Sequence, residues 1–313
     1  MTLQPLNLAE LREKLASANS RGEKVESISL DRFDRVLEHT PEDMTVTVEA
    51  GLTLDSLERQ LAQKGQWLAI DPPNPQKLSI GALLAADWSG PRRFGFGTIR
   101  DYLIGLKVVL ADGRLIKSGG KVVKNVAGYD LQKVFVGSRG SLGVMVEATF
   151  KLRPLPEAER FVGAPCESLQ MANALLESVV ESEVTPSVLD LHRLAPSSAG
   201  SWVVVAGFSG SGEEVLWQLD QVTALGLREA ATLDYEKSFW AAPGKINRIS
   251  VLPSRMVEKL DALGNVPFIV RAGNGVIFFR GPAPAPQGGL PVALMRRLKN
   301  EFDPRNILPE MSW

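Results

Sequence analysis

Glycine is concentrated in one part of this chain. Between Gly81 and Gly143, 63 residues hold 12 of the 28 glycines in the 313-residue sequence, about twice their even share. Because glycine adopts positive φ without strain and lets a backbone approach a ligand closely, such a density is typical of an anion site built from loops. It is equally typical of a series of tight turns. Glycine content alone leaves both interpretations open.

Charge is uneven in the same window. It holds four acidic residues and ten basic ones, so it carries a formal charge of +6 while the remaining chain carries -7. The asymmetry indicates a bound phosphate, a carboxylate substrate or an acidic partner surface, and a solvated basic face explains it equally well. The ten basic residues are Arg92, Arg93, Arg100, Lys107, Arg114, Lys117, Lys121, Lys124, Lys133 and Arg139. The whole chain has a charge of only -1, which argues against nucleic-acid binding.

Cysteine and histidine are scarce. The single cysteine, Cys166, has no partner for a disulfide, and no thiolate set exists for zinc or an iron-sulfur cluster, so we expect any cluster to lie on a partner. The two histidines, His39 and His192, have no metal-ligand spacing around them. We interpret both as surface or helix-end residues, with catalysis or metal binding as the alternative.

The start of the chain gives an expectation about location. Residues 1–15 include several charged and polar side chains and lack the apolar core of a signal peptide. No apolar run approaches the roughly 20 residues that span a bilayer. We therefore expect a cytoplasmic protein that reaches the inner membrane, if at all, through partners.

Periodicity in the first half predicts a mixture of helices and strands. Asn7 and Thr53 each precede an apolar stripe at helical spacing, so each is expected to cap a helix. Strands are expected at Thr45–Glu49 and Val144–Leu152, and two more within Leu106–Lys117. Because strands and helices do not alternate regularly, the class is α+β rather than a doubly wound sheet.

The pattern changes after a proline-rich linker at 154–156. From residue 160 the chain reads strand, helix (168–182), strand (187–192), strand (202–208) and helix (213–225), an order that predicts a ferredoxin-like layer. The expected organisation is a first domain over 1–156, a smaller ferredoxin-like α+β cap domain over 157–290, and a C-terminal helix over 291–313 that returns to the first domain.

Common nucleotide motifs are absent. No G-x-G-x-x-G opens a helix after a strand, and no G-x-x-x-x-G-K-[ST] occurs. The segment Gly207–Gly212 is glycine-rich but lacks the lysine. We interpret it as a strand-to-helix turn with Ser211 as the N-cap, and a ligand-binding loop is the alternative.

A series of short motifs resembles a known family. They are Asp71-Pro72-Pro73, Ser79-Ile80-Gly81-Ala82, Ser89-Gly90-Pro91-Arg92-Arg93, Gly97–Asp101, Gly119-Gly120, Lys124–Leu131 (KNVAGYDL) and Gly137–Val144. In this order they resemble the FAD-binding domain of the vanillyl-alcohol oxidase/p-cresol methylhydroxylase flavoprotein family. Within it, KNVAGYDL and GPRR are most similar to the FAD-binding subunits of bacterial glycolate oxidases. The match is specific over about residues 40 to 156 and weaker beyond.

The resemblance implies a two-subdomain FAD-binding domain and a set of residues for non-covalent FAD. In such proteins backbone amides of two loops surround the diphosphate. The segment 79–82 would form the second loop, 86–90 the flavin side, and 140–144 the ribose and adenine side. The implied FAD-binding residues are Pro73, Ser79, Ile80, Gly81, Ala82, Ala86, Asp87, Ser89, Gly90, Asn125, Gly128, Tyr129, Gly140, Ser141, Leu142, Gly143 and Val144.

The sequence departs from the family pattern in three places. The glycine-rich first diphosphate loop is missing, since residues 15–30 hold only Gly22. Ala82 stands where relatives usually have a second glycine, and alanine would cost about 1 kcal/mol there if φ were positive. Asp87 replaces a common asparagine and places a negative charge near a dianionic cofactor. All three changes weaken FAD binding or leave it unchanged.

The resemblance also bears on catalysis. Related hydroxyacid dehydrogenases carry histidines in the second domain, whereas Val270–Val276 contains none. Arg271 could pair with a carboxylate, but we interpret it as a solvated surface residue. The first hypothesis is therefore an FAD-binding accessory subunit of a glycolate (2-hydroxy acid) oxidase complex, which assists electron transfer from a catalytic flavoprotein subunit to an iron-sulfur subunit. The second is a flavin-free scaffold of the same complex, and the third a self-sufficient oxidase, which we do not expect.

Overall fold

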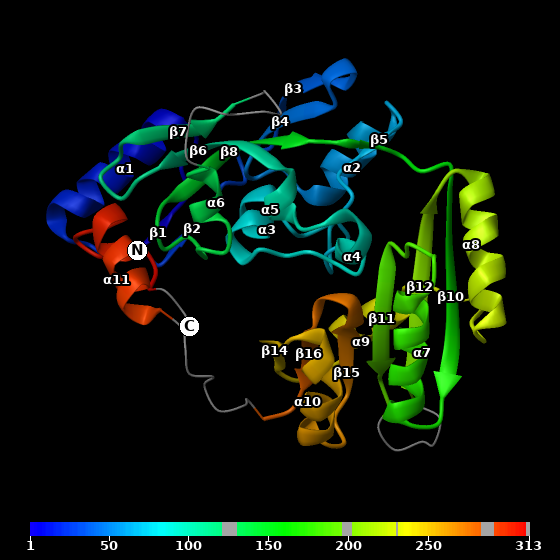
Figure 1. Ribbon diagram of the computed structural model, residues 1–313. Helices are drawn as coiled ribbons and strands as arrows, with labels where there is room; N and C mark the ends of the chain where they lie inside the picture. The colour runs from blue at the N-terminus through cyan, green and yellow to red at the C-terminus, as the bar shows by residue number, and fades with distance from the viewer. Residues whose placement is uncertain (121–129, 196–201, 230, 283–290, 311–313) are drawn as a thin grey trace. The chain divides into compact units, whose positions relative to one another are not determined.

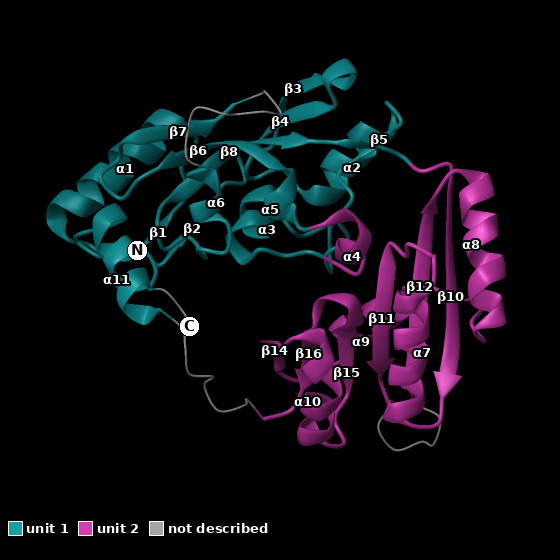
Figure 2. Ribbon diagram, in the orientation of Figure 1, with its two compact units in different colours: residues 1–89, 98–155, 288–313 teal, residues 90–97, 156–287 magenta. Residues whose placement is uncertain are grey.

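The structure is a computed structural model of the 313-residue chain. It describes all residues except 121–129, 196–201, 230, 283–290 and 311–313 (Figure 1). The chain forms two compact units (Figure 2). The first unit consists of residues 1–89, 98–155 and 288–313, and the second of residues 90–97 and 156–287.

A five-stranded antiparallel sheet forms the centre of the first unit. Its strand order is β3-β4-β8-β6-β7. The strands are β3 (Val36–Thr40), β4 (Thr45–Glu49), β6 (Leu103–Val109), β7 (Leu115–Gly119) and β8 (Val144–Lys151). Two small sheets accompany it: β1 (Thr2–Leu3) with β2 (Ser27–Ile28), parallel, and β5 (Gln66–Trp67) with β9 (Arg153–Pro154), antiparallel. The strands predicted over 45–49, 106–117 and 144–152 are confirmed.

The helices of the first unit include the two whose N-caps the sequence predicts. They are α1 (Leu8–Arg21), α2 (Leu54–Ala62), α3 (Ile80–Ala86), α5 (Ile99–Tyr102), α6 (Gln132–Phe135) and α11 (Val292–Phe302), with a 3₁₀ turn, η1 (Pro41–Asp43). Asn7 Oδ1 accepts a hydrogen bond from the Glu10 amide at 3.0 Å, and Thr53 Oγ1 accepts one from the Ser56 amide at 3.3 Å. Both predicted N-caps are confirmed.

The hydrophobic core of the first unit joins both ends of the chain. Leu11 and Leu15 of α1 are fully buried against Val146 of β8. Ile307 and Leu308, which follow α11, are buried in the same cluster. The C-terminal segment is therefore part of the core that the first helix closes.

An antiparallel sheet of seven strands forms the second unit, in the order β13-β10-β12-β11-β15-β16-β14. The strands are β10 (Ala158–Cys166), β11 (Val188–Arg193), β12 (Trp202–Gly210), β13 (Arg228–Glu229), β14 (Ile246–Ser250), β15 (Phe268–Arg271) and β16 (Val276–Arg280). Strands β10 to β13, with the helices α7 and α8 between them, form a βαββαβ unit along the chain. In the sheet these four strands lie in the order β13-β10-β12-β11, which is the ferredoxin-like order, so the predicted ferredoxin-like layer is confirmed. The sequence analysis did not predict the extension of this sheet by β15, β16 and β14.

Helices lie on both faces of this sheet. On one face α7 (Leu169–Glu181), α8 (Gly212–Ala224) and α10 (Met256–Leu263) share one apolar core with the strands. The other face carries α9 (Asp234–Ala241), because its Tyr235 contacts Asp190 while the neighbouring Leu189 and Leu191 point into that core. The remaining turns are α4 (Arg93–Phe96), η2 (Pro253–Arg255) and η3 (Ala272–Asn274).

Ser211 begins α8 as predicted. Its Oγ accepts a hydrogen bond from the Glu214 amide at 3.3 Å, and the Glu214 carboxylate accepts one from the Ser211 amide at 3.0 Å. This reciprocal pair is a capping box, which stabilises the start of a helix. The glycine-rich segment 207–212 is therefore the strand-to-helix turn.

Residues 90–97 are held within the second unit by polar contacts. The Arg92 guanidinium makes two hydrogen bonds to the Glu159 carboxylate, at 2.8 and 2.5 Å. The Gly95 amide donates to the Ser187 carbonyl at 3.0 Å, and a Cβ on Gly95 would lie 2.6 Å from the Ser187 Cα atom. The segment that contains GPRR is thus bound to strands of the second unit by its own hydrogen bonds.

Candidate functional site

A cavity of about 330 Å³ lies in the first unit. This volume falls within the range of small-molecule sites, about 300–1,000 Å³. Three segments and two single residues line it. The lining residues are 25–28, 30 and 31 in the first segment, 79, 81, 82 and 85 in the second, 139, 140 and 143–145 in the third, and Gly51 and Pro309.

The cavity brings together part of the predicted site. Among the implied FAD-binding residues, Ser79, Gly81, Ala82, Gly140, Gly143 and Val144 line it. Seven others in the same unit do not: Pro73, Ile80, Ala86, Asp87, Ser89, Ser141 and Leu142. Gly90 belongs to the second unit. Asn125, Gly128 and Tyr129 lie outside the described residues.

The loop over 140–143 presents open backbone to the cavity. Gly140 has φ +78°, and a Cβ built on it would meet no atom within 4 Å. Among the described residues, the amides of Gly140 and Gly143 donate hydrogen bonds to no other atom, whereas the Ser141 amide donates to the Ser138 carbonyl at 3.0 Å. Backbone donors of this kind are suited to an anionic or nucleotide ligand.

The segment 79–82 is arranged differently. The Ile80 and Gly81 amides donate to the Leu52 and Ala50 carbonyls at 2.8 and 2.6 Å, and the Ala82 amide donates to Ser79 Oγ at 3.2 Å. Ser79 is the N-cap of α3, so these contacts start that helix. Three of the four amides are thus already engaged within the protein.

The structure locates two of the three departures from the family pattern. Ala82 lies in the first turn of α3 and does not have positive φ, so it carries none of the strain that such a position would impose. Asp87 is the residue after α3 and has φ +51°, a left-handed conformation that aspartate and asparagine tolerate better than most residues. Asp87 does not line the cavity.

Strand β2 occupies the side of the cavity where the first diphosphate loop was expected. The amides of Val25, Glu26 and Ser29 donate to the carbonyls of Ile307, Met1 and Leu3, at 2.7 to 2.9 Å. These amides are unavailable to a ligand. Glu26 and Asp31 also belong to the lining, and the exposed Glu26 carboxylate lies 3.7 Å from the N-terminal ammonium of Met1.

Most of the positive charge in the glycine-rich window lies elsewhere. Arg92, Lys107, Arg114 and Lys133 form ion pairs with nearby carboxylates. Arg139 is the member of the ten that lines the cavity, among those that the structure describes. Two of these pairs use Asp112 and Asp130 of the window itself, and two use Glu147 and Glu159 outside it, so local pairing offsets part of the charge asymmetry.

Comparison with known proteins assigns this unit. Residues 13–119 match the family described as "FAD binding domain". The whole fold is similar to a solved alkyldihydroxyacetonephosphate synthase, with a TM-score of 0.74 and 19% identity over 98% of this chain and 75% of that one. Residues 13–119 therefore carry an FAD-binding domain, and the synthase shares the fold of the chain.

Two curated relatives carry glycolate oxidase names. The chain is 39% identical to "Glycolate oxidase subunit GlcD" of Bacillus subtilis over 159 residues, which are 50% of this chain and 34% of that protein. It is 33% identical to "Glycolate oxidase subunit GlcE" of Escherichia coli over 229 residues, which are 70% of this chain and 61% of that protein. The chain thus spans less than two thirds of the length of each.

FAD is the cofactor of this domain family, and the cavity fits its nucleotide half in part. The Gly140 and Gly143 amides, the open space at Gly140 and the Arg139 side chain suit a phosphate-bearing ligand. The engaged amides of 80–82 and the carboxylates of Glu26 and Asp31 oppose one.

Several lining residues were not predicted. They are residues 25–28, 30 and 31, Gly51, Ala85, Arg139, Met145 and Pro309. Arg139 lies inside the motif 137–144 and was counted only as one of the basic residues. Pro309 reaches the cavity from the far end of the chain, and no local pattern indicates such a contact.

The second unit contains a buried ionic cluster that corrects the interpretation of Arg271 as a surface residue. Arg271 is 1% exposed. Its Nη1 donates to Asp190 at 2.5 Å and to Glu236 at 2.6 Å, and its Nη2 donates to Glu236 at 2.9 Å. Tyr235 donates to Asp190 at 2.6 Å, and Trp240 donates to Glu236 at 2.8 Å. The guanidinium joins β11, β15 and α9 and is occupied by two carboxylates.

Burial shifts the protonation equilibria in this cluster. Desolvation raises the pKa of Asp190 to about 6, and Glu236 adds to the rise, against the opposing effect of Arg271. Although burial alone would lower it, the charges of Asp190 and Glu236 raise the pKa of Arg271 well above its ordinary value. Asp190 Oδ1 has no hydrogen-bond partner among the described residues, consistent with a poorly solvated carboxylate.

Both histidines lie in strands and are partly exposed, so neither is a helix-end residue. His39 lies in β3, and its Nε2 is 2.8 Å from Gln66 Oε1. His192 lies in β11, and its ring stacks on Tyr235 with centroids 4.5 Å apart. Burial lowers the pKa of His192 to about 4, so the ring is neutral near pH 7. The helix-end position was wrong because both residues lie in strands whose neighbours come from distant sequence.

The described residues contain no group of three or more histidine, cysteine, aspartate and glutamate side chains placed to hold a metal ion. None of the helices in this part of the chain combines the length and apolar character that crossing a bilayer requires.

Proposed function

We propose that this chain is an FAD-binding accessory subunit of a glycolate oxidase-like complex, which oxidises a 2-hydroxy acid. Its partners would be a catalytic flavoprotein subunit and an iron-sulfur subunit. The observation that carries the proposal is the similarity to GlcE over 70% of the chain, together with a cavity lined by the Gly140 and Gly143 amides. The cytoplasmic location expected from the sequence is part of this proposal.

The side chains around the cavity favour an accessory role over a catalytic one. Oxidation of a 2-hydroxy acid to a 2-oxo acid needs a base for the hydroxyl proton and releases two electrons. Flavin accepts electrons singly or in pairs. The lining carboxylates, Glu26 and Asp31, lie on the β2 side, and no histidine lines the cavity. We therefore assign this chain the holding of FAD and leave proton abstraction to the partner.

The visible spectrum of the isolated chain is the first test. Purified full-length protein, incubated with FAD and desalted, should absorb near ~450 nm and should not reduce a dye with glycolate or lactate. After addition of the catalytic and iron-sulfur subunits, the mixture should reduce the dye with the 2-hydroxy acid. Turnover of a 2-hydroxy acid by the isolated chain would overturn the accessory role.

A flavin-free scaffold is the second candidate, favoured by one specific observation. The β2 side of the cavity offers two carboxylates and engaged amides where relatives have a diphosphate loop. A colourless protein that ignores added FAD, yet is required for assembly of the active complex, would establish the scaffold and exclude the flavoprotein.

A further inference from the structure

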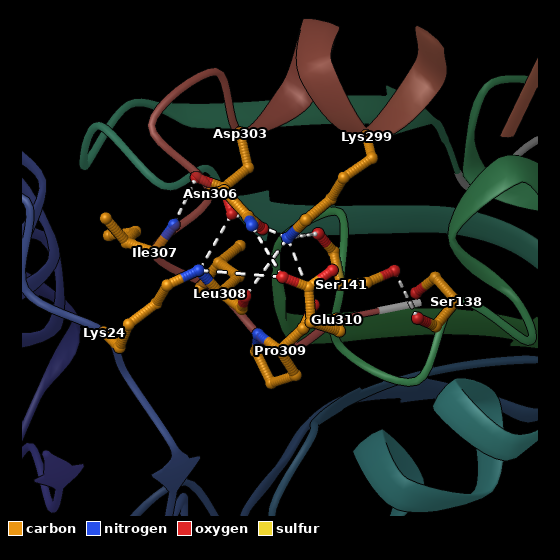
Figure 3. A network of polar contacts seen from close by, with 10 residues as sticks. All are labelled: Lys24, Ser138, Ser141, Lys299, Asp303, Asn306, Ile307, Leu308, Pro309 and Glu310. Carbon is orange, nitrogen blue, oxygen red and sulfur yellow. Dashed lines mark hydrogen bonds and ion pairs between the residues drawn. The ribbon is translucent and has the colours of Figure 1, made fainter. Parts of the chain in front are cut away.

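The C-terminal segment contains a buried lysine that touches the cavity-lining loop. Lys299 of α11 is 6% exposed. Four oxygens lie around its Nζ: Ser141 O at 2.9 Å, Asp303 Oδ2 at 2.7 Å, Pro309 O at 3.1 Å and Leu308 O at 3.2 Å (Figure 3). A single ammonium thus joins the loop over 140–143, the end of α11 and the tail that follows it.

The four acceptors of the Lys299 ammonium differ in charge. Only Asp303 carries a charge, and the other three are backbone carbonyls. An ammonium has three N–H donors, so these four oxygens share them. A buried ion pair alone would be satisfied by Asp303, and the carbonyls of Ser141 and Pro309 are held in addition. The arrangement fixes backbone rather than only neutralising a charge.

The two fixed carbonyls belong to two segments that border the cavity. Ser141 is fully buried between the lining residues Gly140 and Gly143, while Pro309 itself lines the cavity. Because the Ser141 carbonyl is bound to Lys299 on the protein side, the turn between the two glycines cannot rotate freely. Within the turn, the Ser141 amide and Oγ donate to the Ser138 carbonyl at 3.0 and 2.6 Å, and Lys299 adds the contact that ties the turn to the C-terminal segment.

Asp303 holds the tail side in the same way. Its carboxylate accepts hydrogen bonds from the Ile307 amide at 3.0 Å and the Leu308 amide at 2.8 Å. The Ile307 carbonyl in turn accepts one from the Val25 amide at 2.7 Å, and Val25 also lines the cavity. Lys299 and Asp303 therefore connect three parts of the lining: the 140–143 loop, Pro309 and Val25.

We propose that Lys299, supported by Asp303, is a positioning residue for FAD: it holds the 140–143 loop and the C-terminal tail so that the Gly140 and Gly143 amides face the nucleotide. Lys299 contacts no ligand itself. The inference rests on the proposed flavoprotein function and adds the group that shapes its site.

The test measures FAD and ADP dissociation constants on the full chain. ADP is the nucleotide half of FAD and reports on the cavity without the flavin ring. Partners that orient the ligands of a metal site are typically worth about 10- to 100-fold in affinity, and we take the same range for a residue that orients a nucleotide-binding loop. We expect Lys299→Met to weaken FAD and ADP by a similar factor in this range, and amide hydrogen exchange to accelerate in residues 138–144 more than in α2.

Leu57→Ala is the matched control. Leu57 of α2 is fully buried in the same unit and does not line the cavity. The Leu57→Ala substitution should lower the thermal midpoint and leave the FAD and ADP dissociation constants within about threefold of the wild-type values. Equal weakening by Leu57→Ala and Lys299→Met at equal thermal midpoint would overturn the positioning role.

Lys299→Arg guards against failure of the methionine variant to fold. Arginine retains the charge beside Asp303, but its planar, spread donors cannot converge on the Ser141 and Pro309 carbonyls from one nitrogen. We expect a folded protein that binds FAD at least about threefold more weakly. Wild-type affinity in either folded lysine variant would refute the inference alone. Failure of the wild-type chain to bind FAD would refute the flavoprotein function and this inference with it.

Discussion

Among the residues that the structure describes, each unit buries one cation, and the two cations have different partners. In the first unit Lys299 binds one carboxylate and three backbone carbonyls. In the second unit Arg271 binds two carboxylates, and Asp190 lies directly opposite it in the pairing of β11 with β15. Lysine contacts loops that line a cavity, whereas arginine joins two strands and a helix.

The comparison indicates what each buried charge can do. A cation that holds carbonyls fixes the course of the backbone, so its removal should first affect what that backbone binds. A cation that lies between two buried carboxylates neutralises them, so its removal should first affect stability, because unpaired charges remain in the interior. The predictions below test this division.

The largest effect is expected from Arg271→Met. The substitution leaves Asp190 and Glu236 buried without a cation, and loss of one partner from a buried ion pair typically costs about 3–5 kcal/mol. Urea unfolding should show this loss. The FAD affinity of the folded protein should not change, since all cavity-lining residues belong to the first unit. Arg35→Met is the control, because Arg35 has a 71% exposed side chain in its pair with Glu49 and should have little effect.

The second effect concerns pH and the same cluster. The raised pKa of Asp190 gives stability that is complete below its ordinary pKa of 3.8 and is lost as the pH rises to about 6. The lowered pKa of His192 gives stability that is complete above its ordinary pKa of 6.5 and is lost as the pH falls to about 4. Between pH 4 and 6 the two slopes are opposite, so wild-type stability should change little.

Removal of His192 should leave the contribution of Asp190 to the pH dependence of stability unopposed. In His192→Gln, the free energy of unfolding should fall by up to about 3 kcal/mol as the pH rises from 4 to 6. Urea titrations at half-unit pH steps measure this slope. His39→Gln is the control, since His39 lies in the first unit and should not alter the slope. Identical profiles for His192→Gln and wild type would contradict the assigned shifts.

Local patterns explain what could be predicted from the sequence. The caps at Asn7, Thr53 and Ser211 and the βαββαβ order depend on neighbours a few residues apart, and each is found in the structure. The extension of the second sheet was missed for two reasons. The Asn274-Gly275 pair between β15 and β16 is a hairpin signal that the sequence analysis did not use. Strand β14 pairs with β16 across α10 and β15, so no local pattern indicates that contact. Residues 140 and 143 were indicated by a glycine motif, and both line the cavity.

Contacts across long sequence distances explain what could not be predicted. Arg271 and Asp190 are 81 residues apart, and Lys299 and Ser141 are 158 apart. No residue near Arg271 in the sequence indicates that it pairs with two carboxylates, so the local pattern predicted a solvated arginine. The carboxylates of Glu26 and Asp31 could likewise be assigned to the cavity only once β2 was placed.

A smaller effect is expected from Gly140→Ala, which tests the cavity side of the comparison. At φ +78° alanine costs about 1–2 kcal/mol of stability, and its methyl group enters the space beside the free amide. FAD should bind about tenfold more weakly by equilibrium titration. Gly22→Ala is the matched control, because Gly22 has φ +67° and equally open space at the end of α1 but does not line the cavity. It should lose similar stability and keep its FAD affinity.

The smallest effect should come from Glu26→Gln, and its sign is the informative part. A carboxylate near a diphosphate repels it, so removal of this charge should tighten FAD binding by about two- to fivefold in dilute buffer. The gain should shrink at 1 M salt, where screening acts over about 3 Å. Glu13→Gln removes a charge of the same unit away from the cavity and should not alter affinity. Weaker binding in Glu26→Gln would mean that Glu26 accepts a hydrogen bond from the nucleotide, so that the β2 side supports FAD binding rather than opposing it.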